Sequence, residues 1–180
     1  MKLIESVADA LGVDVATVVT HDRNLLNASL RTRGGRGRAA ARMTPNDAAN
    51  LIIAVAGADQ VQNSVNAVKN FGSLRFDPIH SSSREIPGLS MAHTFREVLS
   101  EFIAGFQSGD LALASSIELE IKLTRPNYEA EISGEIDGMS LVFKYARPPR
   151  AGCDPPGREL SITATFTHRT PWQVGEALRM

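Results

Sequence analysis

The feature that most restricts the fold is a change in the spacing of apolar residues near residue 117. From there to residue 166, apolar side chains alternate with polar ones in four short stretches, beginning with IELEIKL at 117–123. A period of two places the apolar side chains on one face of a strand. Asp137-Gly138 adds a hairpin turn signal between two of the stretches. The pattern predicts a four-stranded antiparallel sheet that needs a cover on its apolar face.

The cover is predicted to be an amphipathic helix just before the strands. Residues 91–107 place their apolar side chains along one helical face, and Gly109 ends the pattern. These apolar residues are Met91, Phe95, Val98, Leu99, Phe102, Ile103 and Phe106. After the last strand, Thr170-Pro171 is expected to open a short terminal helix, with a capping-box partner at Gln173.

From the start of the chain to about residue 71 the periodicity is helical. A first helix is expected from about Lys2 to Leu11, and Gly12 stops it. Asp14 then caps a second helix that ends near Ser29. Pro45–Ala56 forms a third, and a fourth is predicted for Asp59–Phe71, followed by a connecting segment over 76–90.

The start of the third helix carries a strong local signal. Thr44 is expected to cap it, and Pro45 occupies the first helical position, where its missing N–H costs nothing. Asp47 completes a capping box with Thr44.

Positive charge is concentrated between the second and third helices. The chain has a formal net charge of −1, yet the stretch RTRGGRGRAAAR carries five arginines and no acid, namely Arg31, Arg33, Arg36, Arg38 and Arg42. A guanidinium can clamp a phosphate through two parallel hydrogen bonds, and the glycines let the backbone approach closely. We interpret the stretch as a β-wing or a basic loop that contacts nucleic acid; a solvated loop is the alternative.

The first two helices have the spacing of a helix-turn-helix. Ala8 permits close approach, Gly12 makes the turn, and Val18 fills the gap from the second helix. This arrangement turns one side of the second helix outward. Near base edges we expect the side chains of Thr17, Thr20, His21 and Arg23.

With these parts in order, residues from about Leu3 to Gly57 resemble the DNA-binding module of the MerR-type winged-helix regulators and their excisionase relatives. In that family the second helix reads Thr, aliphatic, Arg, Tyr, Tyr, acid, Arg, and residues 17–23 here read TVVTHDR. Val19 stands where the family has a DNA-contacting arginine, and Thr20 and His21 replace two tyrosines. The resemblance implies a winged helix-turn-helix fold, with Arg31 to Arg42 matching the wing and Thr44 and Asp47 the start of the third helix.

The predicted fold is therefore α+β: an N-terminal winged helix-turn-helix unit, then a long helix packed on a four-stranded antiparallel sheet. We expect a DNA-binding module at 1–57, a helix and linker at 58–90, and a dimerisation, sensing or partner domain at 91–180. The predicted function is sequence-specific binding of double-stranded DNA by a cytoplasmic transcriptional regulator of bacterial or bacteriophage type. If the protein forms a homodimer, its C-terminal domain is expected to hold it together. The alternative is a structural or assembly adaptor, such as a virion or packaging component, that binds protein through the sheet and nucleic acid non-specifically.

Other constellations carry little chemistry. His80 and His93 flank a serine-rich stretch without the spacing of a nucleophile elbow or a zinc site, and structural roles are expected for both. Cys153 is the only cysteine. Trp172 is predicted to pack the terminal helix onto the sheet, or else to anchor a partner. We expect no catalytic residue, no metal site, no cofactor and no membrane association, and hence not an enzyme.

Overall fold

The alternating stretches form strands of one antiparallel sheet. The computed structural model describes residues 2–33, 43–82, 92–109, 116–147 and 160–179. Within them, the four predicted strands are β2 (Ile117–Arg125), β3 (Glu129–Ile136), β4 (Met139–Ala146) and β5 (Ile162–Thr167). Alternation correctly predicts which face is buried: Leu119, Ile121 and Leu123 of β2 are buried, and Glu120 and Lys122 between them are not.

The sheet contains a fifth strand in a segment that the sequence analysis assigned to a connection. Strand β1 (Arg75–Asp77) pairs antiparallel with β4, and the order across the sheet is β1-β4-β3-β2-β5. Three residues are too few for an alternating pattern to be visible in sequence. The strand is fixed by Phe76, whose ring stacks on His93 with centroids 4.9 Å apart.

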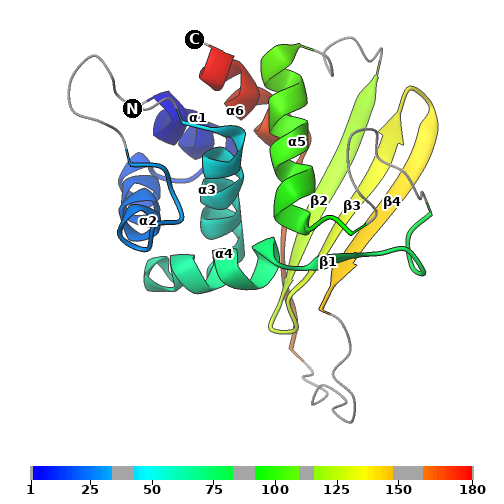
Figure 1. Ribbon diagram of the computed structural model, residues 1–180, viewed down its shortest axis with the longest axis horizontal. Helices are drawn as coiled ribbons and strands as arrows, with labels where there is room; N and C mark the ends of the chain where they lie inside the picture. Colours follow the sequence, from blue (N-terminus) through cyan, green and yellow to red (C-terminus); the bar gives the residue numbers. More distant parts are fainter. Residues whose placement is uncertain (1, 34–42, 83–91, 110–115, 148–159, 180) are drawn as a thin grey trace.

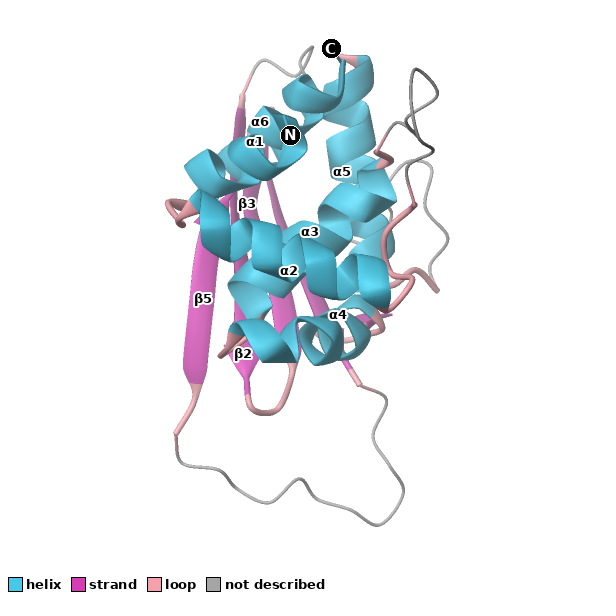
Figure 2. Ribbon diagram, turned by 90° about the vertical axis from the view of Figure 1, so that its left-hand side faces the viewer, coloured by secondary structure: helices cyan, strands magenta, loops and turns pink. Residues whose placement is uncertain are grey.

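The six α-helices of the described residues form a layer on one face of this sheet, and no described element covers the other face (Figure 1). Viewed from the helix side, the helices stand in front of the strands (Figure 2). In the described part of the chain the helices are α1 (Lys2–Leu11), α2 (Val15–Asn27), α3 (Pro45–Gly57), α4 (Ser64–Gly72), α5 (Phe95–Ser108) and α6 (Arg169–Arg179), with a short 3-10 turn, η2 (Val61–Asn63), before α4. The combination confirms the predicted α+β class.

Helices from both ends of the chain share one core. Helix α3 contacts α5 and strand β2, and α1 packs along α6. The Ser6 hydroxyl of α1 donates to the Gln173 carbonyl of α6 at 3.1 Å. The buried apolar side chains, from Leu3 in α1 to Val174 in α6, belong to a single cluster. The division into units 1–57 and 91–180 stays a prediction. The shared core means that the two regions pack against each other.

Three helix starts differ from their predicted positions. The helix predicted from Asp59 begins as the 3-10 turn η2 at Val61, and α4 itself starts at Ser64. Helix α5 begins at Phe95 because Thr94 caps it and Glu97 closes a capping box, while Met91 lies outside the described residues. Helix α6 begins at Arg169, one residue before Thr170, whose hydroxyl donates to the carbonyl of Ala10 in α1 at 3.4 Å. The capping box predicted for Thr170 and Gln173 is therefore wrong.

Trp172 lies in the first turn of α6 and is 47% exposed. About half of its side chain is exposed, and Trp172 does not belong to the buried core, so its predicted role in packing α6 onto the sheet is not borne out. Pro171 and Val174 of the same helix are buried instead.

Candidate functional site

The first two helices form a hairpin around Gly12, as the spacing predicts. Gly12 has a φ of 64°, the left-handed conformation in which glycine ends a helix without a side-chain clash. Asp14 caps α2 by accepting a hydrogen bond from the Ala16 N–H at 2.8 Å. Ala8 and Val18 are both buried. The framework of the predicted hairpin is thus present.

One side of α2 faces solvent and carries most of the residues predicted to contact DNA. Thr20 and Arg23 are exposed, and Thr17 is half-buried. The Thr20 hydroxyl donates to the Ala16 carbonyl of the same helix at 2.9 Å, so no neighbouring element holds it. These three side chains lie where an external ligand can reach them.

His21, the fourth predicted contact on α2, lies on the buried side of the helix. It is 4% exposed, and its Nδ1 lies 2.8 Å from the Ser64 hydroxyl at the start of α4. The Ser64 hydroxyl donates to the Val61 carbonyl, so the His21 Nδ1–H is the donor to Ser64. Burial lowers the pKa of His21. Contrary to the prediction from the sequence, His21 is therefore not available to contact DNA, because η2 and α4 cover this side of α2. Its ring instead links α2 to the start of α4.

Asp22 of α2 is also turned inward, where it holds Arg31. The Arg31 Nε lies 2.6 Å from Asp22 Oδ1, with the arginine side chain 19% exposed. Burial raises the pKa of the Asp22 carboxyl, and the Arg31 charge opposes that shift. Arg31 is therefore engaged in an internal ion pair. The exposed side of α2 carries one cation, Arg23, and no exposed carboxylate comes from within the helix.

Asp47 holds both flanks of the arginine-rich segment. Its Oδ1 accepts from the Thr32 backbone N–H at 2.7 Å and from the Thr32 hydroxyl at 3.2 Å. Its Oδ2 accepts from the Thr44 N–H and hydroxyl, both at 2.9 Å. Asp47 is 3% exposed. Burial by itself would raise the pKa of Asp47, but the hydrogen bonds from Thr44 and Thr32 outweigh it and lower the pKa. We call this arrangement of Asp47, Thr32 and Thr44 the Asp47 clamp.

The remaining arginines are only partly described. Arg33 is exposed, just after the clamped Thr32. Arg36, Arg38 and Arg42 lie outside the described residues. Residues 31–33 and 43 form no strand, and the β-wing stays a prediction for the segment between them.

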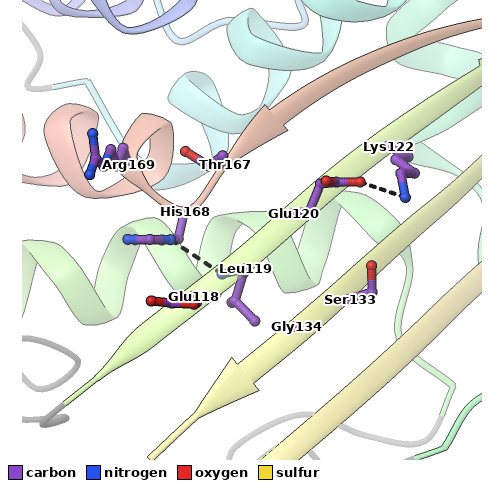
Figure 3. A pocket seen from close by; sticks show the side chains of 9 residues that line it. All are labelled: Glu118, Leu119, Glu120, Lys122, Ser133, Gly134, Thr167, His168 and Arg169. Atoms are coloured by element: carbon purple, nitrogen blue, oxygen red, sulfur yellow. Dashed lines mark hydrogen bonds and ion pairs between the residues drawn. The ribbon is translucent and has the colours of Figure 1, made fainter.

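A second feature is an open recess of about 590 Å³ in the uncovered face of the sheet (Figure 3). The Leu119 N–H donates to His168 Nδ1 at 3.2 Å, so the ring carries its proton on Nε2 when neutral. Lys122 pairs with Glu120 at 2.5 Å. The lining residues come from β2, β3 and the start of α6: Glu118, Leu119, Glu120, Lys122, Ser133, Gly134, Thr167, His168 and Arg169. Because carboxylates and cations face the recess together, it offers no field of one sign to a polyanion.

Comparisons with protein-family models, with curated proteins and with solved structures gave no significant match. The assignment of function therefore depends on geometry. Among the residues that the structure describes, no three His, Cys, Asp or Glu side chains are grouped so that they could hold a metal ion. No helix in the same part of the chain is long and apolar enough to cross a membrane.

The capping role of Asp47 could be predicted from the sequence, but its contact with Thr32 and the pairing of Asp22 with Arg31 could not. Thr32 and Asp47 are 15 positions apart, outside the range of any local motif. His80 and His93 have the structural roles expected of them. The His80 ring contacts Asp77 at 2.7 Å in a loop, and the buried His93 ring contacts the Tyr145 hydroxyl at 2.9 Å.

Proposed function

We propose that this protein binds double-stranded DNA in a sequence-specific manner and regulates transcription. The proposed interface consists of the exposed side of α2, with Thr17, Thr20 and Arg23, and of Arg33 at the edge of the arginine-rich segment. In this proposal residues 1–57 act as a winged helix-turn-helix, in which phosphate contacts position the protein and side chains on α2 read base edges.

The observation that carries the proposal is the way the arginine-rich segment is attached. Arg31 is paired with Asp22 of α2, and the Asp47 clamp binds the segment's two flanks at the start of α3. The exposed side of α2 and the start of the segment are thereby fixed to the same two helices. A helix that meets base edges and a basic segment that meets phosphates need such a fixed relation, because the groove and the backbone have a fixed spacing.

Charge supports the same surface. Asp22, the acid within α2, is buried against Arg31, so its carboxylate does not oppose phosphates. The exposed acids near this surface are Glu5 and Asp9 of α1 and Asp14, whose carboxylate is engaged in capping the start of α2. The open sheet face, by contrast, mixes Glu118, Glu120 and other acids with lysines.

The direct test is selection of bound sequences from random duplexes. A regulator enriches one motif and prefers it to scrambled competitors by at least about 10³. The same selection with Arg33, Arg36 and Arg38 changed to alanine is expected to give weaker binding to all sequences with the motif retained, since phosphate contacts carry no sequence information. Absence of any enrichment at low salt would contradict the proposal.

Salt dependence tests the proposed surface itself. Each lost phosphate contact reduces the slope of log affinity against log salt by about 0.9. The double variant Arg23→Ala/Arg33→Ala is expected to lose up to about twice that amount. The matched control is Lys122→Ala/Lys144→Ala, which removes the same charge from the open sheet face and should leave the slope unchanged. If the two double variants reduce the salt slope equally, binding depends on net charge alone and not on the proposed surface.

A second candidate is an assembly adaptor, and the open sheet face is the observation that favours it. This face is polar and uncovered by any described element, and it carries Glu118, Glu120, Glu129, Glu131 and Glu135. An adaptor would bind protein there and contact nucleic acid without sequence preference. Binding of duplexes without motif enrichment, together with loss of partner binding when the glutamates are replaced, would favour this candidate.

A further inference from the structure

Strand β5 forms one edge of the sheet made by the described strands. It is the last strand in the order β1-β4-β3-β2-β5 and pairs only with β2 among the described strands. Figure 2 draws it along one border of the molecule with no element beyond it. Thr163, Thr165 and Thr167 are all exposed, so no described element covers this edge.

The free hydrogen-bonding groups of this edge can be assigned from the ladder. The N–H of His168, the residue after β5, donates to the Leu119 carbonyl of β2 at 2.9 Å. In an antiparallel pair, alternate residues direct their N–H and C=O groups toward the same neighbour. His168 and the even-numbered residues of β5 therefore face β2. Thr163, Thr165 and Thr167 direct their backbone groups away from it, toward the open edge.

The edge lacks the features that usually prevent pairing with another chain. Natural edges are short, charged, bulged or interrupted by proline. The sequence ITATFT of β5 has no charge and no proline, and its pairing with β2 runs one-to-one from Ile162 to Thr167 without a bulge. The opposite edge, β1, is three residues long and carries Arg75 and Asp77. Only the β5 edge is thus suited to accept a further strand.

We propose that β5 pairs antiparallel with β5 of a second copy of this chain, so that two five-stranded sheets join into one. A two-fold axis at Thr165 places Thr165 opposite its own counterpart and Thr163 opposite Thr167 of the second copy. All three outward-facing backbone pairs can then exchange hydrogen bonds, and the threonine side chains lie opposite one another on the open face. Threonine pairs are favourable across antiparallel strands.

The features around β5 favour a second copy over a different partner. An uncharged strand offers nothing for a charged partner to complement, and it brings no like charges together when it pairs with itself. The register also brings the exposed apolar side chains at the start of one β5 close to the end of β5 in the second copy. Leu160 and Ile162 are 75% and 52% exposed. In the two-fold pair they come opposite positions 170 and 168 of the second copy, beside the first turn of α6, which carries the half-exposed Trp172. This proposal goes beyond DNA binding and does not depend on it.

The experiment measures the association state of the full chain by sedimentation equilibrium. The wild type is expected to be a dimer at micromolar concentrations. Thr165→Pro removes an outward N–H that β2 does not use, and it is expected to weaken association at least about tenfold. Thr165→Ala keeps that N–H and is the matched control, expected to associate like the wild type. A monomeric wild type, or a Thr165→Pro variant that associates like Thr165→Ala, would overturn the proposal.

A charge exchange identifies the partner as a second copy. Thr165→Lys and Thr165→Glu each place like charges opposite one another in the two-fold pair, so each is expected to be monomeric. Mixed in equal amounts, they are expected to form a heterodimer. Ser140→Lys and Ser140→Glu introduce the same charges on β4, away from the edge, and should leave the dimer intact. Dimers that persist in both Thr165 variants, or a mixture that stays monomeric, would contradict the two-fold pairing.

Trp172 supplies an independent signal because it is the only tryptophan in the chain. Dilution of the wild type below the dissociation constant is expected to increase quenching of its fluorescence by acrylamide, as the first turn of α6 loses its neighbour. Thr165→Pro is expected to show the dilute behaviour at all concentrations. Quenching that stays constant while sedimentation shows dissociation would refute the placement of Leu160 and Ile162 beside α6.

Discussion

Helix α2 and strand β2 each have a buried side and an exposed side, but the sequence predicts the buried residues of β2 better than those of α2. On β2 the prediction is confirmed along the strand, since neighbours pack against one face only. On α2 the prediction is wrong for His21, which is 4% exposed. The helix packs against α1 and α3 and also against η2 and α4, so its buried surface is wider than one apolar stripe. Polar residues on the added side become internal hydrogen-bonding groups.

The difference also explains where each region places its charges. The sheet exposes acids and lysines together on its open face, as in the pair of Lys122 with Glu120. The helical region buries Asp22 against Arg31 and Asp47 against two threonines. Burial of Asp22 leaves Asp14, which caps the start of α2, as the exposed carboxylate at this helix, which suits a surface that meets phosphates with the rest of its exposed side.

The largest expected effect compares a glycine from each region. In Gly134→Ala the new Cβ would lie 1.9 Å from the Glu118 carbonyl oxygen, at a φ of 144°. That oxygen belongs to the paired strand β2 and cannot move freely, so we expect a loss of about 3–5 kcal/mol in unfolding free energy, or failure to fold. Gly12→Ala, at a φ of 64° with nothing within 4 Å, should cost about 1–2 kcal/mol. Urea denaturation measures both, and similar losses would refute the comparison.

The next effect concerns the Asp47 clamp. Asp47→Ala removes a buried acceptor from four donor groups, and we expect a loss of about 2–3 kcal/mol. Glu97→Ala is the matched control. Glu97 closes the same kind of capping box with Thr94 at the start of α5 but holds no second segment, so about 1 kcal/mol is expected. If the two variants lose equal stability, the contacts with Thr32 contribute nothing.

The clamp also has a defined pH dependence. The pKa of Asp47 is lowered in the folded protein, so the stabilisation by its carboxylate is complete above the ordinary aspartate pKa. It is lost only as the pH falls below that value toward the lowered one. In acid titrations of unfolding free energy, the difference between wild type and Asp47→Ala should therefore be constant near neutrality and decrease at acidic pH.

A smaller effect tests the burial of His21. Its pKa is lowered in the folded protein, so the unfolded state binds a proton first as the pH falls. Stability should be complete above the ordinary histidine pKa of 6.5 and decrease as the pH falls from there toward the lowered pKa. His21→Gln cannot titrate, and its unfolding free energy should change less over this range. An equal pH slope in wild type and variant would show that His21 is solvated.

Local rules predicted much of the architecture. The Gly12 turn, the Asp14 cap, the Thr44 and Asp47 capping box and the faces of β2 and β3 all depend on residues within four positions or on a period of two. Contacts between residues far apart in sequence could not be predicted in this way. Thr32 with Asp47, His21 with Ser64 and the short strand β1 with β4 arise only when separate elements pack together.

The order of side chains along the chain determined by itself that an amphipathic helix would cover one face of an antiparallel sheet, because the spacing of apolar residues decides which surface each element must bury. Only the tertiary structure decided which polar side chains are buried and which backbone groups at a sheet edge have no described hydrogen-bonding neighbour. Both outcomes depend on which elements pack against a helix or pair with a strand. In this molecule the neighbours of α2 removed His21 and Asp22 from its surface, and the lack of a described neighbour beside β5 left its threonines at an open edge.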